Sequence, residues 1–267
     1  MPQVLANGIM INYEEEGGGE PLLMIMGITA PGSVWADHTE AWKEHYRCIM
    51  PDNRGVGHSS KPEGTYTSAE MADDMASLLD ALDLDRVRVI GVSMGSIIAQ
   101  QLAIRHANRV RSMVLMCPWA RCDRYAVGIF RHMMAAKARL LPEEFMEFIQ
   151  LLIFAKRTWD DDQEYEGLLE SRRAAAVGEY PQPLHGLEGQ AYACMDHDVV
   201  DKLGRITCPT LVIGGEDDIF VPQWMPKEVA DGIPGADLHL YPGAGHAFHW
   251  ERIDDFNSRI IEWLQAH

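Results

Sequence analysis

Hydrophobic residues follow two spacings along the chain, and each spacing predicts one kind of element. Short continuous apolar runs are typical of strands covered on both faces, whereas apolar residues three to four positions apart share one face of a helix. Runs of the first kind lie at 21–26, 48–51, 87–90, 110–116, 209–214 and 238–241. Helical spacing lies between most of these runs. This alternation predicts a mostly parallel sheet flanked by helices.

Two local signals place individual elements. Residues 4–15 predict a β-hairpin, because the central Asn7-Gly8 pair tolerates the positive φ angles of a two-residue turn. Further on, Thr67 and Glu70 have the spacing of a capping box, which opens a helix by pairing side chains with backbone amides. The apolar residues that follow share one face and continue that helix: Met71, Met75, Leu78, Leu79 and Leu82.

The pattern changes after Cys117-Pro118. From 119 to 205 the chain has no strand-like run, and helical spacing dominates at 130–141, 143–155 and 165–177. Strand and helix then alternate again to the end, with a closing helix whose apolar face includes Ile253 and Leu264. We therefore interpret 119–205 as a helical cap inserted into one core, which is formed by 1–118 and 206–267.

Composition and charge narrow the class of protein. The chain has 267 residues, of which 47% are hydrophobic, so it can bury a large core. A net charge of −17 argues against nucleic acid or an anionic membrane as a partner. The N-terminus lacks a signal-peptide pattern, and no apolar run approaches the length of a membrane span. Five scattered cysteines without a C-x-x-C pair indicate reduced thiols, so we expect a cytoplasmic protein. A homodimer stays open.

The strongest chemical motif is Gly91-Val92-Ser93-Met94-Gly95. It follows the apolar run 87–90 and precedes helical spacing at 97–102, which is the strand–turn–helix context of a nucleophile elbow. Such a turn strains the serine backbone and leaves no room for side chains at the flanking positions, so glycine is needed there. The turn lifts the hydroxyl clear of the sheet, in front of the N-terminus of the helix. Ser93 is therefore the predicted nucleophile.

A serine nucleophile needs a base, and His246 is the best candidate. Ligands of parallel sheets bind beyond the carboxyl ends of the strands, and Gly243-Ala244-Gly245-His246 follows directly after the strand that ends at Tyr241. His249 lies close by but lacks small neighbours that would let the main chain approach the elbow. Four other histidines lie in helical or terminal stretches, where an exposed position is the default: His106, His132, His185 and His267.

The base in turn needs a carboxylate that orients it. Asp217 and Asp218 both follow the strand that ends at Ile213, and either could serve. Asp123, after the preceding strand, is a third candidate. The order of serine, acid and histidine along the chain is that of α/β-hydrolases.

Four segments together carry a resemblance that covers essentially the whole chain. They are Asp52-Asn53-Arg54-Gly55-Val56-Gly57-His58-Ser59, the elbow, Gly215-Glu216-Asp217-Asp218 with Pro222, and Gly243-Ala244-Gly245-His246. In these segments the chain resembles an α/β-hydrolase of the esterase, lactonase and perhydrolase kind. The resemblance implies an eight-stranded, mostly parallel sheet with a helical cap inserted after strand 6. It also implies that Asp218, rather than Asp217, is the acid of the triad.

The resemblance further implies an oxyanion hole. One backbone amide would come from Met94, after the nucleophile, and the other from Ile28, after the glycine of the loop that follows the third strand. Relatives usually carry His-Gly at the start of that loop, whereas this chain has Met26-Gly27. The departure favours the lactonase and methylesterase relatives, in which this position varies.

The implied reaction is hydrolysis of small to medium apolar carboxylic esters or lactones through an acyl-enzyme. No metal-ligand spacing or phosphate-binding loop is found, so neither a metal nor a cofactor is expected. We expect Trp119, Met26 and Gly27 to line the pocket, with apolar cap residues above them. Four arginines could bind a substrate carboxylate or form solvated helix faces: Arg121, Arg124, Arg172 and Arg173.

Two other functions stay open. The first is cleavage of a C–C bond in a dienoic diketone, which would use the same triad together with polar cap groups that hold an enolate. The second is a ligand receptor on the same fold. Dehalogenases and epoxide hydrolases are disfavoured, because they need an aspartate at position 93.

Overall fold

A single eight-stranded sheet forms the centre of the molecule. The structure, a computed structural model, describes residues 2–177 and 181–267. The strands lie in the order β1-β2-β4-β3-β5-β6-β7-β8, antiparallel up to β4 and parallel from β4 onwards. Their bounds are β1 Gln3–Ala6, β2 Ile9–Glu16, β3 Glu20–Ile25, β4 Tyr46–Pro51, β5 Val87–Val92, β6 Val110–Met116, β7 Thr210–Gly215 and β8 Asp237–Tyr241. The predicted parallel sheet is confirmed.

The N-terminal hairpin forms as its turn residues predict. Asn7 and Gly8 have φ angles of 48° and 79°, and β1 pairs antiparallel with β2 directly on either side of them. Positive φ at both central residues gives the turn the twist that two paired strands need. The hairpin lies at the edge of the sheet far from β8, and β2 continues the antiparallel pairing onto β4.

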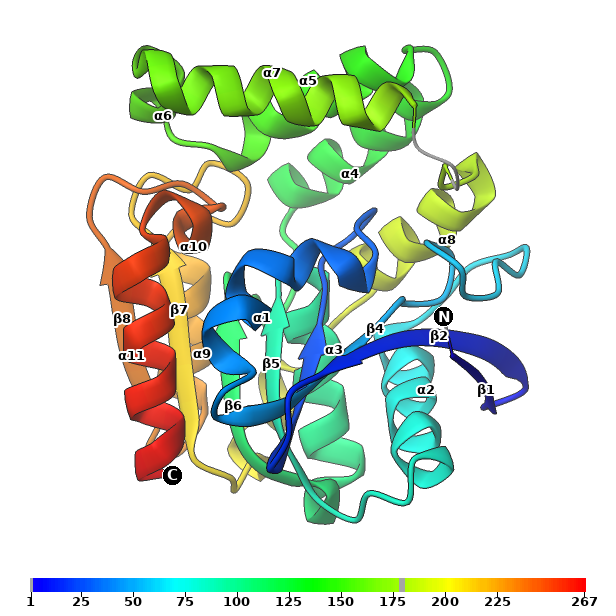
Figure 1. Ribbon diagram of the computed structural model, residues 1–267, viewed down its shortest axis with the longest axis vertical. Helices are drawn as coiled ribbons and strands as arrows, with labels where there is room; N and C mark the ends of the chain where they lie inside the picture. The colour runs from blue at the N-terminus through cyan, green and yellow to red at the C-terminus, as the bar shows by residue number, and fades with distance from the viewer. Residues whose placement is uncertain (1, 178–180) are drawn as a thin grey trace.

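Helices cover both faces of the sheet (Figure 1). One face carries α1 (Ala36–Trp42) and α11 (Ile253–Ala266), which contact each other, with the short α10 (Phe248–Glu251) beside α11. The other face carries α2 (Ser68–Ala81), α3 (Met94–Arg105) and α9 (Trp224–Gly232). Among the described residues, no helix has both the length and the hydropathy needed to cross a bilayer.

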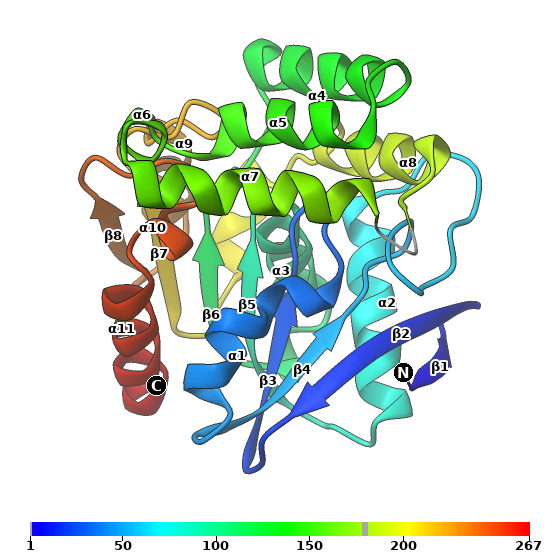
Figure 2. The ribbon, with the colours of Figure 1, turned by 45° about the horizontal axis from the view of Figure 1, so that its top comes forward.

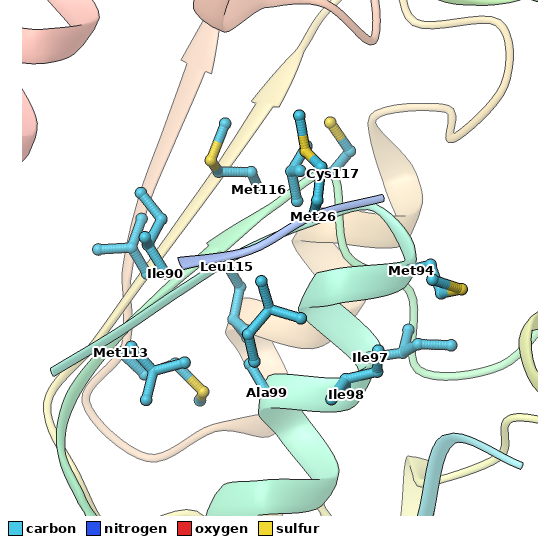
Figure 3. Close-up of a cluster of buried hydrophobic side chains, with 14 of the residues drawn as sticks. Met26, Ile90, Met94, Ile97, Ile98, Ala99, Met113, Leu115, Met116 and Cys117 are labelled. Carbon is cyan, nitrogen blue, oxygen red and sulfur yellow. The ribbon is translucent and has the colours of Figure 1, made fainter. Parts of the chain in front are cut away.

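Helix α3 lies at the centre of the core. Every residue from Met94 to Ile104 is buried, because the helix packs against β5, β6 and α2 at once. Figure 3 shows Ala99 of this helix facing Leu115 of β6, while Ile97 lies on the side of the helix away from Ile90 and Met113. A helix that begins directly after β5 and is held on all sides gives the turn between them a rigid support.

The helix start predicted at Thr67 is confirmed, but its capping is only half of a box. Thr67 Oγ1 accepts the backbone amide of Glu70 at 3.0 Å. The Glu70 carboxylate instead pairs with Arg54 Nη1 at 2.5 Å, and Arg54 also bonds Asp74 through two nitrogens at 2.6 Å each. A buried arginine competes successfully for the carboxylate, because its own charge needs partners. This network fixes the loop after β4 onto α2.

Helices between β6 and β7 form a cap over the carboxyl ends of the strands (Figures 1 and 2). They are α4 (Arg124–Lys137), α5 (Pro142–Ile153), α6 (Lys156–Asp160), α7 (Asp162–Ala176) and α8 (Leu184–Met195). Sequence spacing predicts α4, α5 and α7 but does not single out α6 or α8. The short helix Val200–Arg205 packs against α3 and α9, so these residues lie with the core helices rather than with the cap.

Candidate active site

Ser93 lies on a strained turn between β5 and α3, with φ 54° and ψ −117°. Its two flanking glycines are needed for steric reasons. A Cβ on Gly91 would overlap the carbonyl group of Gly95, and a Cβ on Gly95 would overlap the carbonyl oxygen of Ile25. The main chain of β3 therefore lies so close to the elbow that a residue with a Cβ would not fit at position 95. The nucleophile elbow predicted from the sequence has the geometry that its residues require.

Replacing Gly95 with alanine is expected to destabilise the fold by about 3 kcal/mol or more, because two backbone segments must move apart. Gly128 in α4 is a matched control, since an added Cβ there meets open space. Gly128→Ala should leave stability unchanged or raise it by about 0.5–1 kcal/mol. Urea unfolding of the three proteins measures both effects. Equal urea midpoints for Gly95→Ala and the wild type would contradict the close contact between Gly95 and the Ile25 carbonyl oxygen.

His246 and Asp218 form a buried pair. His246 Nδ1 lies 2.7 Å from Asp218 Oδ2, and Asp218 Oδ1 accepts the backbone amides of Phe220 and Val221 at 2.8 Å each. A carboxylate held by these amides accepts the Nδ1 proton of His246 and leaves Nε2 with its lone pair. The geometry is that of a base oriented by an acid.

The structure distinguishes the three candidate acids. Asp217 is exposed, and its backbone amide bonds the Ala244 carbonyl at 2.9 Å. Asp123 caps α4 by accepting the Ala126 amide at 2.8 Å. Only Asp218, among these three, contacts His246.

The loop expected to complete the oxyanion hole lies against the nucleophile. A Cβ on Gly27 would be 3.5 Å from Ser93 Cβ. Met94 begins α3, so its amide has no partner within the helix. In the part of the chain that the structure describes, the amides of Met94 and Ile28 donate no hydrogen bond. Both are therefore available to a negative oxygen that forms beside Ser93.

Asp52 supports this region without touching the reaction centre. Its carboxylate accepts the amides of Gly32 at 2.7 Å and His58 at 2.8 Å, and Asn12 Nδ2 at 2.9 Å. A Cβ on Gly57 would overlap this carboxylate. The motif 52–59 that carries the family resemblance thus ties the loop after β4 to the loop after β3.

A cavity of about 680 Å³ opens onto Ser93 and His246 beneath the cap. Ligand pockets commonly have volumes of about 300–1,000 Å³. Met26, Gly27 and Ile28 line it from below, as predicted for the first two, and mostly apolar residues of α5 and α7 line it from above. The acidic residues Asp37, Glu164 and Glu251 also line it, whereas no lysine or arginine does so among the described residues.

Trp119 does not line this cavity, contrary to the expectation from its place after β6. Cys117 turns the chain with φ 46°, and Trp119 then becomes buried against Phe130 with ring centroids 6.2 Å apart. Phe130 contacts Phe220, which in turn lies on the cavity beside His246. Trp119 therefore supports the wall from one layer behind.

Glu251 joins the histidine loop to the cap, a role that the sequence analysis did not identify. Its Oε2 accepts the Gly245 amide at 2.7 Å. Its Oε1 accepts the Ala155 amide at 2.8 Å and the Thr158 hydroxyl at 2.7 Å. The only sequence signal is an acidic residue five positions after His246. One carboxylate thus fixes the distance between the catalytic loop and the segment from α5 to α6.

His249 lies on the cavity wall but belongs to a different buried pair. Its Nδ1 is 2.8 Å from His38 Nε2, and His38 Nδ1 is 2.7 Å from Asn257 Oδ1. Burial lowers the pKa of His38 to about 4, and burial also lowers the pKa of His249 well below its ordinary value. Both histidines are therefore neutral near pH 7, and His249 is engaged by His38 rather than by a carboxylate.

Cys117 completes a compact group with Asp218 and His246, whose ligand-type atoms all lie within 4.8 Å of one another. The thiol donates to the His246 carbonyl oxygen at 3.2 Å. Burial raises the pKa of Cys117 well above its usual value, so the group is a thiol rather than the thiolate that metals prefer. Within this group, Asp218 already bonds His246 Nδ1. The three side chains therefore fit a histidine oriented by a carboxylate better than a set of metal ligands.

Comparisons with known proteins identify the family of the chain. A family model described as alpha/beta hydrolase fold matches residues 20–253. A protein of Mycobacterium tuberculosis named "Putative non-heme bromoperoxidase BpoC" is 32% identical over 96% of this chain and 99% of its own. A thermophilic esterase from Thermogutta terrifontis is 26% identical, with a TM-score of 0.86 over 99% of this chain and 98% of its own. The enol-lactonase from Burkholderia xenovorans is 25% identical, with a TM-score of 0.88 over 99% of this chain and all (100%) of its own. The chain therefore belongs to the alpha/beta hydrolase fold family.

Proposed function

We propose that this hydrolase cleaves carboxylic esters or lactones with small to medium, uncharged, mostly apolar acyl groups. The observation that carries the proposal is the grouping of three features around Ser93, which lines the cavity together with His246 and Ile28. The first is Ser93 on its elbow, and the second is the pair of His246 Nδ1 and Asp218 Oδ2 at 2.7 Å. The third is the pair of backbone amides of Met94 and Ile28, which donate no hydrogen bond within the described part of the protein. Their combination is the arrangement that acyl transfer to a serine requires.

In the proposed mechanism, Ser93 Oγ attacks the ester carbonyl while His246 Nε2 takes its proton. Asp218 holds the resulting imidazolium, and the two amides hold the oxyanion. The tetrahedral intermediate collapses, and His246 returns the proton to the alcohol that leaves. Water then adds to the acyl-enzyme with the same histidine as base, and the carboxylic acid is released. For a lactone the alcohol stays tethered to the acyl chain.

The charges around the cavity support an uncharged substrate. None of the four arginines considered from the sequence lines it. Arg172 instead bonds Gln150 at 2.6 Å and Glu147 at 2.9 Å, and Arg173 pairs with Glu166 at 3.3 Å. A substrate carboxylate would meet the wall carboxylates without a cation to balance it, and burying an unpaired charge is costly.

A matched pair of esters tests both the reaction and this charge preference. p-Nitrophenyl butyrate and mono-p-nitrophenyl succinate have acyl chains of the same length, but only the second ends in a carboxylate. At pH 7.5 the neutral ester should be hydrolysed, with kcat/KM about tenfold or more above that of the anionic one. A preference for the succinate would overturn the charge argument. Failure to hydrolyse neutral esters and simple lactones alike would overturn the proposed function.

A further inference from the structure

The peptide that carries the Ile28 amide is anchored on both sides by side-chain amides. On one side, Asn53 Nδ2 donates to the Met26 carbonyl oxygen at 2.9 Å. On the other, the backbone amide of Thr29 donates to Gln190 Oε1 at 3.0 Å. The Gly27–Ile28 peptide lies between these two fixed peptides. Its N–H direction is therefore set by groups outside the loop.

Gln190 has the properties of a rigid anchor. It is fully buried on α8, a helix of the cap. Its Nε2 donates to the Arg54 carbonyl oxygen at 2.8 Å, and its Oε1 also accepts Gln182 Nε2 at 2.9 Å. If the Gln190 side-chain amide were turned over, its NH₂ group would face two other donors, the Thr29 backbone amide and Gln182 Nε2. The network thus fixes which end of the Gln190 side chain faces the loop.

The loop needs such an anchor because its backbone is strained. Thr29 has a φ of 71°, which a β-branched residue rarely adopts. Without an acceptor for the Thr29 amide, this residue can relax to negative φ, and the neighbouring peptide would turn with it. The histidine that relatives carry before the glycine is Met26 here, and its side chain offers no strong hydrogen bond to the loop.

We propose that Gln190 is a positioning residue for the oxyanion hole, which couples the docking of cap helix α8 to the direction of the Ile28 amide. This inference rests on the proposed function, because it assigns the Ile28 amide to the oxyanion. Gln190 does not touch the reacting atoms. Its contribution is made in the transition state, so it should act on kcat rather than on KM.

The test compares Gln190→Met with Gln182→Met, using p-nitrophenyl butyrate as substrate. Both glutamines are buried members of the same network, but only Gln190 bonds the loop. Gln190→Met should lower kcat about 10- to 100-fold with KM within threefold, since losing a whole oxyanion donor costs about 100- to 1,000-fold. Gln182→Met should change kcat by less than about threefold, because the bond between Thr29 and Gln190 remains.

A second readout separates positioning from general loosening. The serine oxygen adds to the carbonyl carbon of an alkyl trifluoromethyl ketone and forms a tetrahedral oxyanion. The affinity for this ketone should therefore fall by the same factor as kcat in Gln190→Met. Wild-type levels of kcat and ketone affinity in Gln190→Met would overturn the positioning role while the function stands. An inactive wild type would instead overturn the proposed function, and the Gln190 assignment with it.

Discussion

Ser93→Ala is expected to lower kcat/KM for p-nitrophenyl butyrate by about 10⁵-fold, to the residual rate that binding and the oxyanion amides alone sustain. The reason is that no other nucleophile lies at the elbow. Among the described residues that line the cavity, Ser171 is the other serine, and its hydroxyl is on cap helix α7, where it donates to Leu168 and accepts from Gln150. Without Ser93 the proposed acyl-enzyme loses the nucleophile at the elbow.

Steady-state hydrolysis and intact-mass spectrometry measure this effect together. Wild-type protein treated with a fluorophosphonate should gain one adduct on the peptide that contains Ser93, and Ser93→Ala should gain none. Ser258→Ala is a suitable control, because Ser258 lies exposed on α11, far along the chain from the elbow. More than about 1% residual activity in Ser93→Ala would be incompatible with a serine mechanism.

Asp218→Asn is expected to lower kcat by about 10³- to 10⁴-fold, whereas Asp217→Asn should stay within about twofold of the wild type. An asparagine at 218 keeps the shape of the side chain but can place an N–H donor toward His246 Nδ1. The histidine then carries its proton on Nε2 and cannot take the proton of Ser93. The exposed Asp217 makes no contact with the imidazole, so the same change there removes only a surface charge.

The two asparagine variants form a matched pair, since the residues are adjacent and the chemical change is identical. Rates are compared at equal folded fraction, which near-ultraviolet circular dichroism reports. Asp218 also accepts two backbone amides, so a lowered melting temperature is expected for its variant alone. A greater loss of kcat in Asp217→Asn would reverse the assignment of the acid.

Local patterns in the sequence determined most of the architecture. The hairpin at Asn7-Gly8, the buried strands and the elbow around Ser93 depend on residues that are close along the chain. Their physical causes are positive φ, continuous apolar runs and the lack of room for a Cβ, and each can be recognised without knowing distant contacts. His246 could be singled out for the same reason, because small residues precede it at the end of a strand.

The tertiary structure decided which of several equivalent residues meet. Local order along the chain leaves Asp217 and Asp218 equivalent, and only the family resemblance singled out Asp218, which lies against His246 in the structure. Trp119 turns behind the cavity wall instead of into it. Gln190 reaches the loop at Thr29 across 161 positions of sequence. Side-chain direction at these sites depends on how elements far apart in the chain pack, and no periodicity of the sequence encodes that. The sequence thus predicted the fold and the candidate nucleophile, and its family resemblance the candidate acid. Packing between cap and core determined the charge of the cavity wall and the support of the loop after β3.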